Sequence, residues 1–426
     1  MQSYLIKLTC IFYLIITSAY GALSLNACYD LAIANSDTMS LADIRALIEE
    51  DRTREVWGMA LPQLSASADF LTRGDVKDIH HHKHTKNARV SLIVPLFNFG
   101  GQKNLINAQE KREESAFINI ESARLEVLHS TNMAYFLLLE AQKIVQVLQD
   151  SAQTLNNQQR ITKDFVEQGL LHENETMIVE VELELLQQDL VQAQNNRSLA
   201  VAKLNHLIGY SLDYPTTVED IFEETGPLIN IDQLLCQALS NHPILKSLQA
   251  QIEASQYAHK AEKGKLYPNI YGYSNYSTTD DYALPYTHGL DAGIGLQMSI
   301  YDGGTTWAKL KRLKKETCEL EQQYQAEEKN IELKMRTAFF NMENASTKIP
   351  ITLKEIELAE KNLKMTEDHF SEGLVTNDDV VLNEEKLMKS RFNYFQALYQ
   401  YHKAKADLIY AAGINLYKRG CKYDGQ

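Results

Sequence analysis

Residues that interrupt secondary structure are scarce in this sequence. Its 426 residues include only 8 prolines and 19 glycines, so helices and strands can run far without a break. The five cysteines lie far apart and lack the paired spacing of a metal or redox motif. Positive charge is in deficit, with a formal net charge of −14, which argues against a nucleic-acid partner. The excess acidic residues are expected mainly on solvated helix faces.

Long apolar runs are also nearly absent. The one clear run, residues 8–17, follows Lys7 and precedes small residues at 19–21, so residues 1–21 are a predicted signal peptide. No other run approaches the roughly 20 residues that a membrane-spanning helix needs. The mature chain is therefore expected to be exported and to cross a membrane only as β-structure. Lipid attachment at Cys28 is a weaker alternative, because the residue two positions before it is not small.

The chain contains a long internal repeat. Three glycine pairs, Gly100/Gly304, Gly169/Gly373 and Gly209/Gly413, keep the same separation of 204 positions. A repeat of this length predicts two structurally equivalent halves. The predicted parts are repeat 1 (22–209), an equatorial linker (210–230), repeat 2 (231–413) and a short tail (414–426).

Each repeat is predicted to contain a helix, two strands and a long helical hairpin. In repeat 1 these are a helix over about 25–58, strands over about 60–73 and 89–99, a long helix 102–168, a tip at Gly169 and a helix 174–208. In repeat 2 they are a helix 231–263, strands over about 268–277 and 290–301, a long helix 306–372, a tip at Gly373 and a helix 378–412. Pro350 falls inside the second long helix and is expected to kink it.

The hairpin helices show a coiled-coil pattern, because apolar residues of 102–168 recur at two heptad positions. A helix of 67 residues is about 100 Å long. Two of the shorter helices placed end to end have the same length. We therefore expect 174–208 to stack on 231–263, and 378–412 to stack on 25–58.

The segment 290–301 alternates strictly between apolar and polar or small residues. Leu290, Ala292, Ile294, Leu296, Met298 and Ile300 share one side, and Asp291, Gly293, Gly295, Gln297 and Ser299 share the other. This pattern is typical of a barrel strand between lipid and water, and equally of a half-buried strand in a soluble sheet.

Four strands per chain are too few to close a barrel. In lipid, an open sheet edge leaves unpaired backbone groups, so other chains must pair with it. Three chains would supply twelve strands and enclose a lumen, whereas the eight strands of two chains normally enclose only side chains. A homotrimer is therefore expected.

These features together resemble the TolC-like outer-membrane efflux protein family, over essentially the whole mature chain. The motifs that carry the resemblance are Leu61-Pro62 and Tyr267-Pro268 before the strands, Pro95-Leu96-Phe97 and Ile300-Tyr301-Asp302-Gly303-Gly304 after them, and the Gly-Leu turns at 169–170 and 373–374. The fold implied is mixed α and β: a trimeric 12-stranded β-barrel in the outer membrane, continued by a periplasmic α-helical barrel. The function implied is a passive exit duct of a tripartite efflux or type I secretion system. Its partners would be a periplasmic adaptor and an inner-membrane transporter, which selects the substrate.

The resemblance also implies an acidic ring where the hairpin tips form the periplasmic entrance. Glu175, Asp378 and Asp379 are the carboxylates at these positions. Like charges brought together by threefold symmetry would raise their pKa values and attract cations. Local helix capping is the alternative explanation for these residues.

The polar tyrosine–arginine latch of the family is not reproduced, since Phe370 and Val375 occupy its positions. Apolar contact of Phe370, Leu374 and Leu382 is therefore the expected closure, with ordinary helix packing as the alternative. Adaptor docking is implied at Gly169, Leu170, Gly373 and Leu374, where a simple turn with an apolar anchor is the alternative.

Catalytic motifs are absent from the sequence. It contains no glycine-rich phosphate loop, no histidine pair at ligand spacing on a helix and no nucleophile elbow, so neither enzymatic activity nor a cofactor is expected. His80, His81, His82 and His84 form a weak metal candidate within a polar loop. The competing hypothesis from another class is an exported coiled-coil scaffold or adaptor that does not insert in a membrane; the strands and the doubled hairpin favour the channel.

Overall fold

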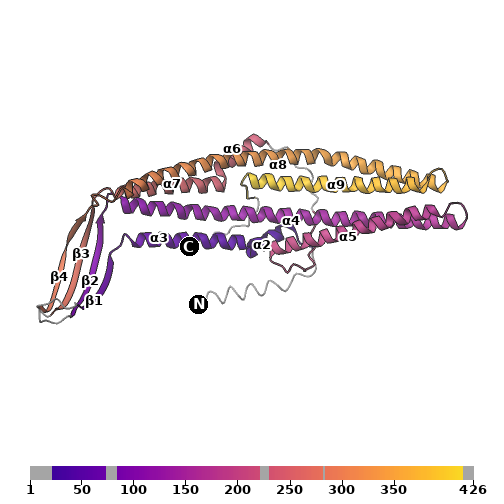
Figure 1. Ribbon diagram of the computed structural model, residues 1–426. Helices are drawn as coiled ribbons and strands as arrows, with labels where there is room; N and C mark the ends of the chain where they lie inside the picture. The colour runs from indigo at the N-terminus through magenta and orange to yellow at the C-terminus, as the bar shows by residue number, and fades with distance from the viewer. Residues whose placement is uncertain (1–21, 73–83, 221–229, 282–283, 416–426) are drawn as a thin grey trace. The chain divides into compact units, whose positions relative to one another are not determined.

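The structure is a computed structural model that describes residues 22–72, 84–220, 230–281 and 284–415 (Figure 1). The predicted signal peptide lies outside these residues. The elements of repeat 1 are α2 (Leu25–Asn35), α3 (Asp37–Gly58), β1 (Gln63–Thr72), β2 (His84–Phe97), α4 (Gly101–Glu167) and α5 (Asn174–Ile208). Those of repeat 2 are α6 (Ile231–Asn241), α7 (Pro243–Gly264), β3 (Asn269–Asp281), β4 (Leu284–Gln297), α8 (Thr305–Ser371) and α9 (Asn377–Ala411). The same order of elements therefore occurs twice.

The chain divides into two compact units. Unit 1 comprises residues 1–39, 123–242 and 330–426, and unit 2 comprises residues 40–122 and 243–329. Unit 2 contains the sheet, and unit 1 contains both hairpin tips. Each unit is described separately below.

Three strands extend further into the loops than the alternation suggested. β2 begins at His84 rather than at 89, β3 continues to Asp281 rather than 277, and β4 begins at Leu284 rather than 290. The added residues are mostly polar but still pair, as in Thr278 with His288. Backbone pairing continues where the side-chain pattern has ended, so the pattern alone underestimates strand length. β4 also ends at Gln297, before the predicted 301.

Both shorter helices that precede the strands are divided. The predicted helix 25–58 is interrupted at Ser36, whose hydroxyl accepts a hydrogen bond from the Met39 amide at 3.4 Å. The predicted helix 231–263 is interrupted at His242, which precedes Pro243 at the first position of α7. A residue before proline disfavours the helical conformation, and proline is favoured at a helix start.

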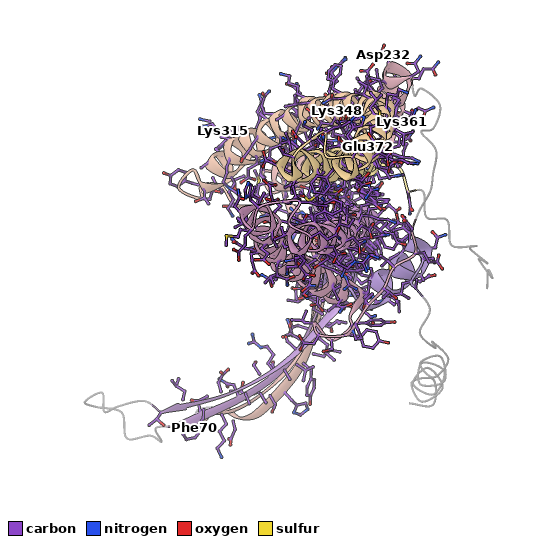
Figure 2. The ribbon with its side chains drawn as sticks, turned by 90° about the vertical axis from the view of Figure 1, so that its right-hand side faces the viewer. Phe70, Asp232, Lys315, Lys348, Lys361 and Glu372 are labelled. Atoms are coloured by element: carbon purple, nitrogen blue, oxygen red, sulfur yellow. The ribbon has the colours of Figure 1, made fainter. Side chains whose placement is uncertain are left out.

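The sheet has the order β1-β2-β3-β4, with every neighbouring pair antiparallel. Paired residues point to the same side, so the register assigns each side chain to a face. One face is mainly apolar: Leu64, Ala66, Ala68, Phe70, Val90, Leu92, Val94, Ile270, Tyr276, Leu290, Ala292, Ile294 and Leu296. The other is mainly polar or small: Ser65, Ser67, Asp69, Asn87, Arg89, Ser91, Asn275, Ser277, Thr279, Asp291, Gly293 and Gly295. No other described part of the chain covers the apolar face, on which Ile294 is 75% exposed and Phe70 projects from the sheet (Figure 2).

Two tyrosines of β3 lie over two glycines of β4 on the polar face. A Cβ atom added at Gly295 would lie 2.4 Å from Cζ of Tyr271, and one added at Gly293 would lie 2.9 Å from the Tyr273 hydroxyl. An aromatic side chain that covers a cross-strand glycine shields the backbone that the glycine leaves bare. These glycines are therefore required by the rings opposite them.

Replacing Gly295 with alanine should lower the free energy of unfolding by about 1 kcal/mol, because the new methyl group must displace the Tyr271 ring. The measurement is the urea midpoint of the purified protein. Gly289→Ala on the same strand is the control, since a Cβ there would meet nothing within 4 Å. Equal effects of the two substitutions would contradict this account of Gly295.

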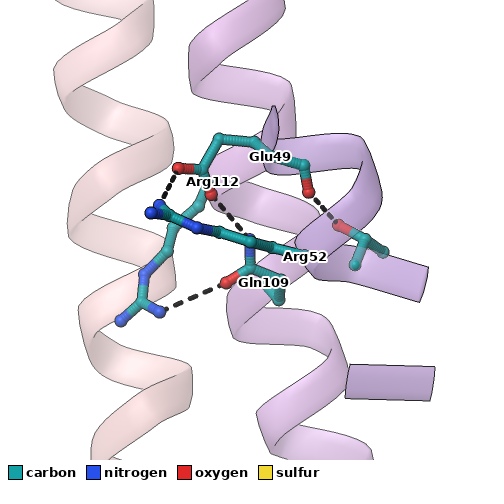
Figure 3. Close-up of polar contacts among 5 residues, drawn as sticks. Glu49, Arg52, Gln109 and Arg112 are labelled. Carbon is teal, nitrogen blue, oxygen red and sulfur yellow. Dashed lines mark hydrogen bonds and ion pairs between the residues drawn. The ribbon is translucent and has the colours of Figure 1, made fainter. Parts of the chain in front are cut away.

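In unit 2, a chain of polar contacts joins α3 to α4 (Figure 3). The Glu49 carboxylate accepts from the Arg52 guanidinium and, at 2.7 Å, from Nε2 of Gln109. Oε1 of Gln109 in turn accepts from Arg112 at 3.3 Å. Gln109 is buried, and both ends of its amide are thus bonded, as a buried polar group requires. The contacts fix α3 beside the first turns of α4.

In unit 1, the carboxyl end of α5 meets α2. Nδ2 of Asn35 donates to the Ile208 carbonyl at 2.8 Å. Gly209 has a φ of 80°, and a Cβ atom on it would lie 2.6 Å from Cβ of Asn35, so only glycine permits this approach. The prediction that 174–208 stacks on 231–263 is therefore wrong at the carboxyl end of α5, which meets α2 instead. Helix lengths match several partners equally well and did not identify the right one.

The two long helices α4 and α8 contain 67 residues each. Pro350 does not end α8, which continues on both sides of it, and the Thr352 hydroxyl donates to the carbonyls of Lys348 and Ile349. Within the described residues, every helix lacks the combination of length and hydrophobicity that a membrane crossing requires.

Candidate functional site at the hairpin tips

Both hairpin tips, in unit 1, are built on the same glycine turn. Gly169 and Gly373 have φ values of 75° and 73°. The amide of the following leucine bonds back into the helix in each case, Leu170 to the Phe165 carbonyl and Leu374 to the His369 carbonyl, both at 2.9 Å. This is a Schellman arrangement, which ends a helix where glycine adopts the left-handed conformation. The repeat therefore specifies two equivalent turns.

The residue after each turn glycine is an exposed leucine. Leu170 and Leu374 are 66% and 68% exposed, and Leu382, on the first turns of α9, is also exposed. The predicted docking and closure residues other than Phe370 thus remain free to contact another molecule. Apolar side chains held outward on a rigid turn are suited to binding a partner.

Phe370 does not belong with these exposed residues. It is 4% exposed and packs in a cluster with Leu363, Val380 and Leu387, and its ring centroid lies 5.9 Å from that of Phe165. The ring occupies the interior of the tip, so ordinary helix packing accounts for it. We therefore remove Phe370 from the predicted apolar closure.

A buried asparagine joins the two tips. Asn377 is fully buried; its Oδ1 accepts from Nε2 of Gln158 at 2.7 Å, and its Nδ2 donates to the Glu175 carbonyl at 2.9 Å. One side chain thus connects the start of α9 to α4 and to the start of α5. Helix capping by Asn377 or Asp378 is the local alternative to an acidic ring, and neither hypothesis includes this bridge between the hairpins.

The predicted acidic residues have different environments. Asp379 accepts from the backbone amide and the hydroxyl of Thr376, at 2.9 and 2.7 Å, in a capping box at the start of α9. These hydrogen bonds hold the pKa of Asp379 below its usual range. Asp378 is exposed. Oε2 of Glu175 is buried and has no hydrogen-bond partner among the described residues. The capping alternative therefore explains Asp379 but leaves Glu175 unexplained.

The two tips differ in how their second helix starts. α9 has the complete capping box of Thr376 and Asp379, whereas the N-cap of α5, Glu173, makes no side-chain capping bond. The repeat therefore conserves the turn between the helices but not the cap that follows it.

Glu384 is a buried carboxyl group that the sequence did not identify as a site. It is 2% exposed; its Oε1 accepts from the Ser151 hydroxyl at 2.7 Å, while Oε2 has no partner among the described residues. Burial raises the pKa of Glu384. The hydrogen bond from Ser151 and the charge of Arg391 oppose this rise with smaller effects, and the nearby Glu367 and Asp150 add still smaller increases. Its counterpart in repeat 1, Glu180, is exposed and lies 3.2 Å from Lys163.

The raised pKa of Glu384 predicts a pH-dependent stability. The folded protein holds this proton more tightly than the unfolded chain, so stability falls as pH rises from the ordinary carboxyl range through the raised pKa. Glu384→Gln should therefore raise the free energy of unfolding at pH 8 by roughly 1–3 kcal/mol and change it little at pH 4. Urea midpoints measured across this range test the prediction.

Glu180→Gln is the matched control, because it removes the equivalent carboxylate from an exposed ion pair. Its effect should stay below about 1 kcal/mol at all pH values. If Glu384→Gln also gave no pH-dependent gain, the buried carboxyl would not be the titrating group.

The other predicted candidates do not form a site in the described structure. His80, His81 and His82 lie outside the described residues, as does the side chain of His84. Among the residues described, no group of three or more His, Cys, Asp or Glu side chains could hold a metal ion. Cys28 is fully buried within α2, and burial raises its pKa to about 12. An acyl chain on its sulfur would have to displace the helix packing around it.

Comparison with known proteins agrees with the doubled fold. The profile of the family described as "Outer membrane efflux protein" matches residues 30–210 and again residues 234–414. The chain belongs to the outer membrane efflux protein family. The two matches are offset by the same 204 positions as the internal repeat. This member of the family is accordingly an outer-membrane protein of the efflux-channel class.

Individual relatives are distant but extend over most of the chain. Outer membrane protein TolC of Salmonella enteritidis is 21% identical over 388 residues, covering 88% of this chain and 78% of TolC. Alkaline protease secretion protein AprF of Pseudomonas aeruginosa is 22% identical over 358 residues, covering 80% of this chain and 72% of AprF. Crystal structures of CusC, described in connection with transmembrane channel formation, share the fold with a TM-score of 0.83 and 15% identity, covering 93% of this chain and 96% of CusC.

Proposed function

We propose that the protein is the outer-membrane channel of a tripartite efflux or type I secretion system, and acts as a passive exit duct. The observation that carries the proposal is the sheet, which has one apolar and one polar face and whose apolar face is uncovered. A wall between lipid and an aqueous lumen requires this division. In such a duct an inner-membrane transporter supplies the energy and selects the substrate, so the channel needs no catalytic group or cofactor. The family description, "Outer membrane efflux protein", supports efflux as one candidate pathway, and the name of AprF, an alkaline protease secretion protein, supports secretion as the other.

The open edges of the sheet support assembly with other copies of the chain. Among the residues that the structure describes, β1 and β4 are the outer strands of the sheet and each pairs on one side only. Each unpaired backbone group in lipid costs several kcal/mol, so β4 of one copy would pair with β1 of the next. Three copies provide the twelve strands of a barrel with an open lumen. A homotrimer is therefore the proposed assembly, with the apolar face toward lipid and the polar face toward the lumen.

The helices of unit 1 also present apolar faces on which other copies can pack. Five residues that are each more than half exposed share one side of α5: Met177, Val181, Leu185, Val191 and Leu199. Five others with similar exposure share one side of α8: Leu333, Phe340, Ile351, Leu358 and Met365. Three of the first set, Val181, Leu185 and Val191, border a groove of about 1050 Å³ between α4 and α5.

Charges beside these two faces are complementary. By helical spacing, Glu180 and Glu184 lie next to the apolar side of α5, and Lys348, Lys354 and Lys361 lie next to that of α8. Lys354 and Lys361 also pair with Glu357 of the same helix. When two different faces of the same chain fit each other, successive copies contact head to tail. Such a chain of copies closes into a ring if the rotation from one copy to the next is a whole fraction of a full turn. We propose that α8 of one copy occupies the α4–α5 groove of the next.

Leu358→Glu should disrupt this contact, because it places a charge at the centre of the apolar side of α8. The expected result is a shift from trimer to monomer, with at least a tenfold higher dissociation constant, measured by analytical ultracentrifugation in detergent. Leu353→Glu is the control, since Leu353 is equally exposed but lies on a different side of α8. Loss of the trimer in both variants, or in neither, would contradict the proposed interface.

We propose that the tips form the periplasmic entrance. Leu170 and Leu374, on the turns of Gly169 and Gly373, are the proposed adaptor contacts. Leu374 and Leu382 are the proposed apolar closure, now without Phe370. Glu175, Asp378 and Asp379 are the proposed acidic ring. Within it, Oε2 of Glu175 is buried and has no hydrogen-bond partner among the described residues.

Asp379→Asn combined with Glu175→Gln should weaken block of the open channel by multivalent cations at least fivefold. The amide oxygen of an asparagine at 379 can still accept from Thr376, so the helix cap is kept while the charge is lost. The measurement is conductance in planar bilayers with increasing concentrations of a trivalent cobalt complex.

Glu357→Gln provides the control for this experiment. Glu357 is exposed and is bonded by Lys354 and Lys361, which hold its pKa at about 2. Its loss should leave the block unchanged. An unchanged block in the double variant would rule out the acidic ring, and the absence of any conductance in the wild type would rule out the channel itself.

A further inference from the structure

A small cavity lies within unit 1 between α2, α4 and α9, away from the tips. Its volume is about 150 Å³. Its lining residues are Leu25, Tyr29, Leu125, Leu128, His129, Asn132, Phe136, His402, Lys405, Ala406, Ile409, Tyr410 and Ile414. Every one of them is buried or half-buried. The channel function proposed above makes no use of this cavity.

Aromatic rings and aliphatic side chains form most of its wall. The rings of His129 and Tyr410 are stacked with centroids 4.5 Å apart, and those of Phe136 and His402 with centroids 5.0 Å apart. Leucines, an alanine and isoleucines make up most of the rest. A cavity of about 150 Å³ with apolar walls accepts a single benzene ring. Flat rings in the wall favour a flat ligand, because aromatic faces pack on one another.

The polar groups in the wall are held in fixed positions. The Tyr29 hydroxyl donates to Oδ1 of Asn132 at 2.6 Å, and Nε2 of His129 lies 2.7 Å from Oδ1 of Asp407. The bond from Tyr29 orients the Asn132 amide so that its NH₂ group can donate to an acceptor in the cavity. Lys405 also belongs to the wall. A few fixed polar groups in a partly open, mainly apolar pocket are typical of a small-molecule site.

We propose that this cavity is a binding site for an uncharged, single-ring aromatic molecule that carries a hydroxyl group, a ligand of the phenol class. The ring lies among Phe136, His402 and Tyr410, and its hydroxyl oxygen accepts from the Asn132 amide. A bound ligand touches α2, α4 and α9 at once, so it stabilises the packing of the three helices. This site is independent of the proposed channel function.

The test is a ¹⁹F NMR titration of the full-length wild-type protein in detergent with 4-fluorophenol. Saturable binding is expected in the wild type. Ala406→Leu fills the cavity and should weaken binding at least tenfold. Ala326→Leu makes the same change at an exposed position of α8 and should leave binding unchanged, which separates the cavity from partition into the micelle.

A second variant, which enlarges the cavity instead of filling it, keeps the test valid even if Ala406→Leu fails to fold. Ile409→Ala enlarges the cavity and should raise the affinity for the two-ring probe 5-fluoroindole about tenfold over the wild type. Equal affinity of wild type and Ala406→Leu for 4-fluorophenol would overturn the proposal. It would also be overturned if 4-fluorophenol bound only after removal of residues 416–426, since the cavity would then belong to the chain's own tail.

Discussion

Antiparallel pairing from β1 to β4 is the constraint on which the two-faced sheet of this protein depends. Because paired residues share a face, a single register keeps the apolar residues of all four strands together. A slip by one residue in any strand would turn its leucines and valines to the polar side. The tyrosines that cover Gly293 and Gly295 oppose such a slip, because each ring fits only over a residue without a side chain. Register and amphipathic character are thus maintained by the same contacts.

The features that follow from backbone geometry could be predicted from one sequence. Glycines at 169, 209 and 373 adopt positive φ at helix ends, and their spacing revealed the repeat. The alternation from Leu290 to Leu296 identified β4 and its two faces. The ends of the strands were harder to predict, because the residues around Thr278 and His288 pair through their backbones and show no apolar alternation. The order and existence of elements therefore follow from local pattern, while their ends depend on pairing with distant residues.

The contacts between the two hairpins could not be predicted from the sequence. Asn377 has the features of an ordinary helix-cap residue, yet it binds Gln158 and the Glu175 carbonyl, both distant along the chain. Glu384 has the same sequence character as its exposed counterpart Glu180, but it is buried against Ser151. The helix position of Phe370 fits packing as well as closure, and only its neighbours distinguish the two. In each case the environment, rather than the residue type, determines the role.

The unequal caps at the two tips have a mechanical consequence. A helix whose first amides are bonded by a side chain resists unwinding better than one whose first amides are not. α9 begins with such bonds from Thr376 and Asp379, whereas Glu173 supplies none to α5. A pull shared equally by the two hairpins would therefore loosen the α4–α5 tip first. Two hairpins with the same turn geometry thus differ in resistance to unwinding because of the residues at one helix start.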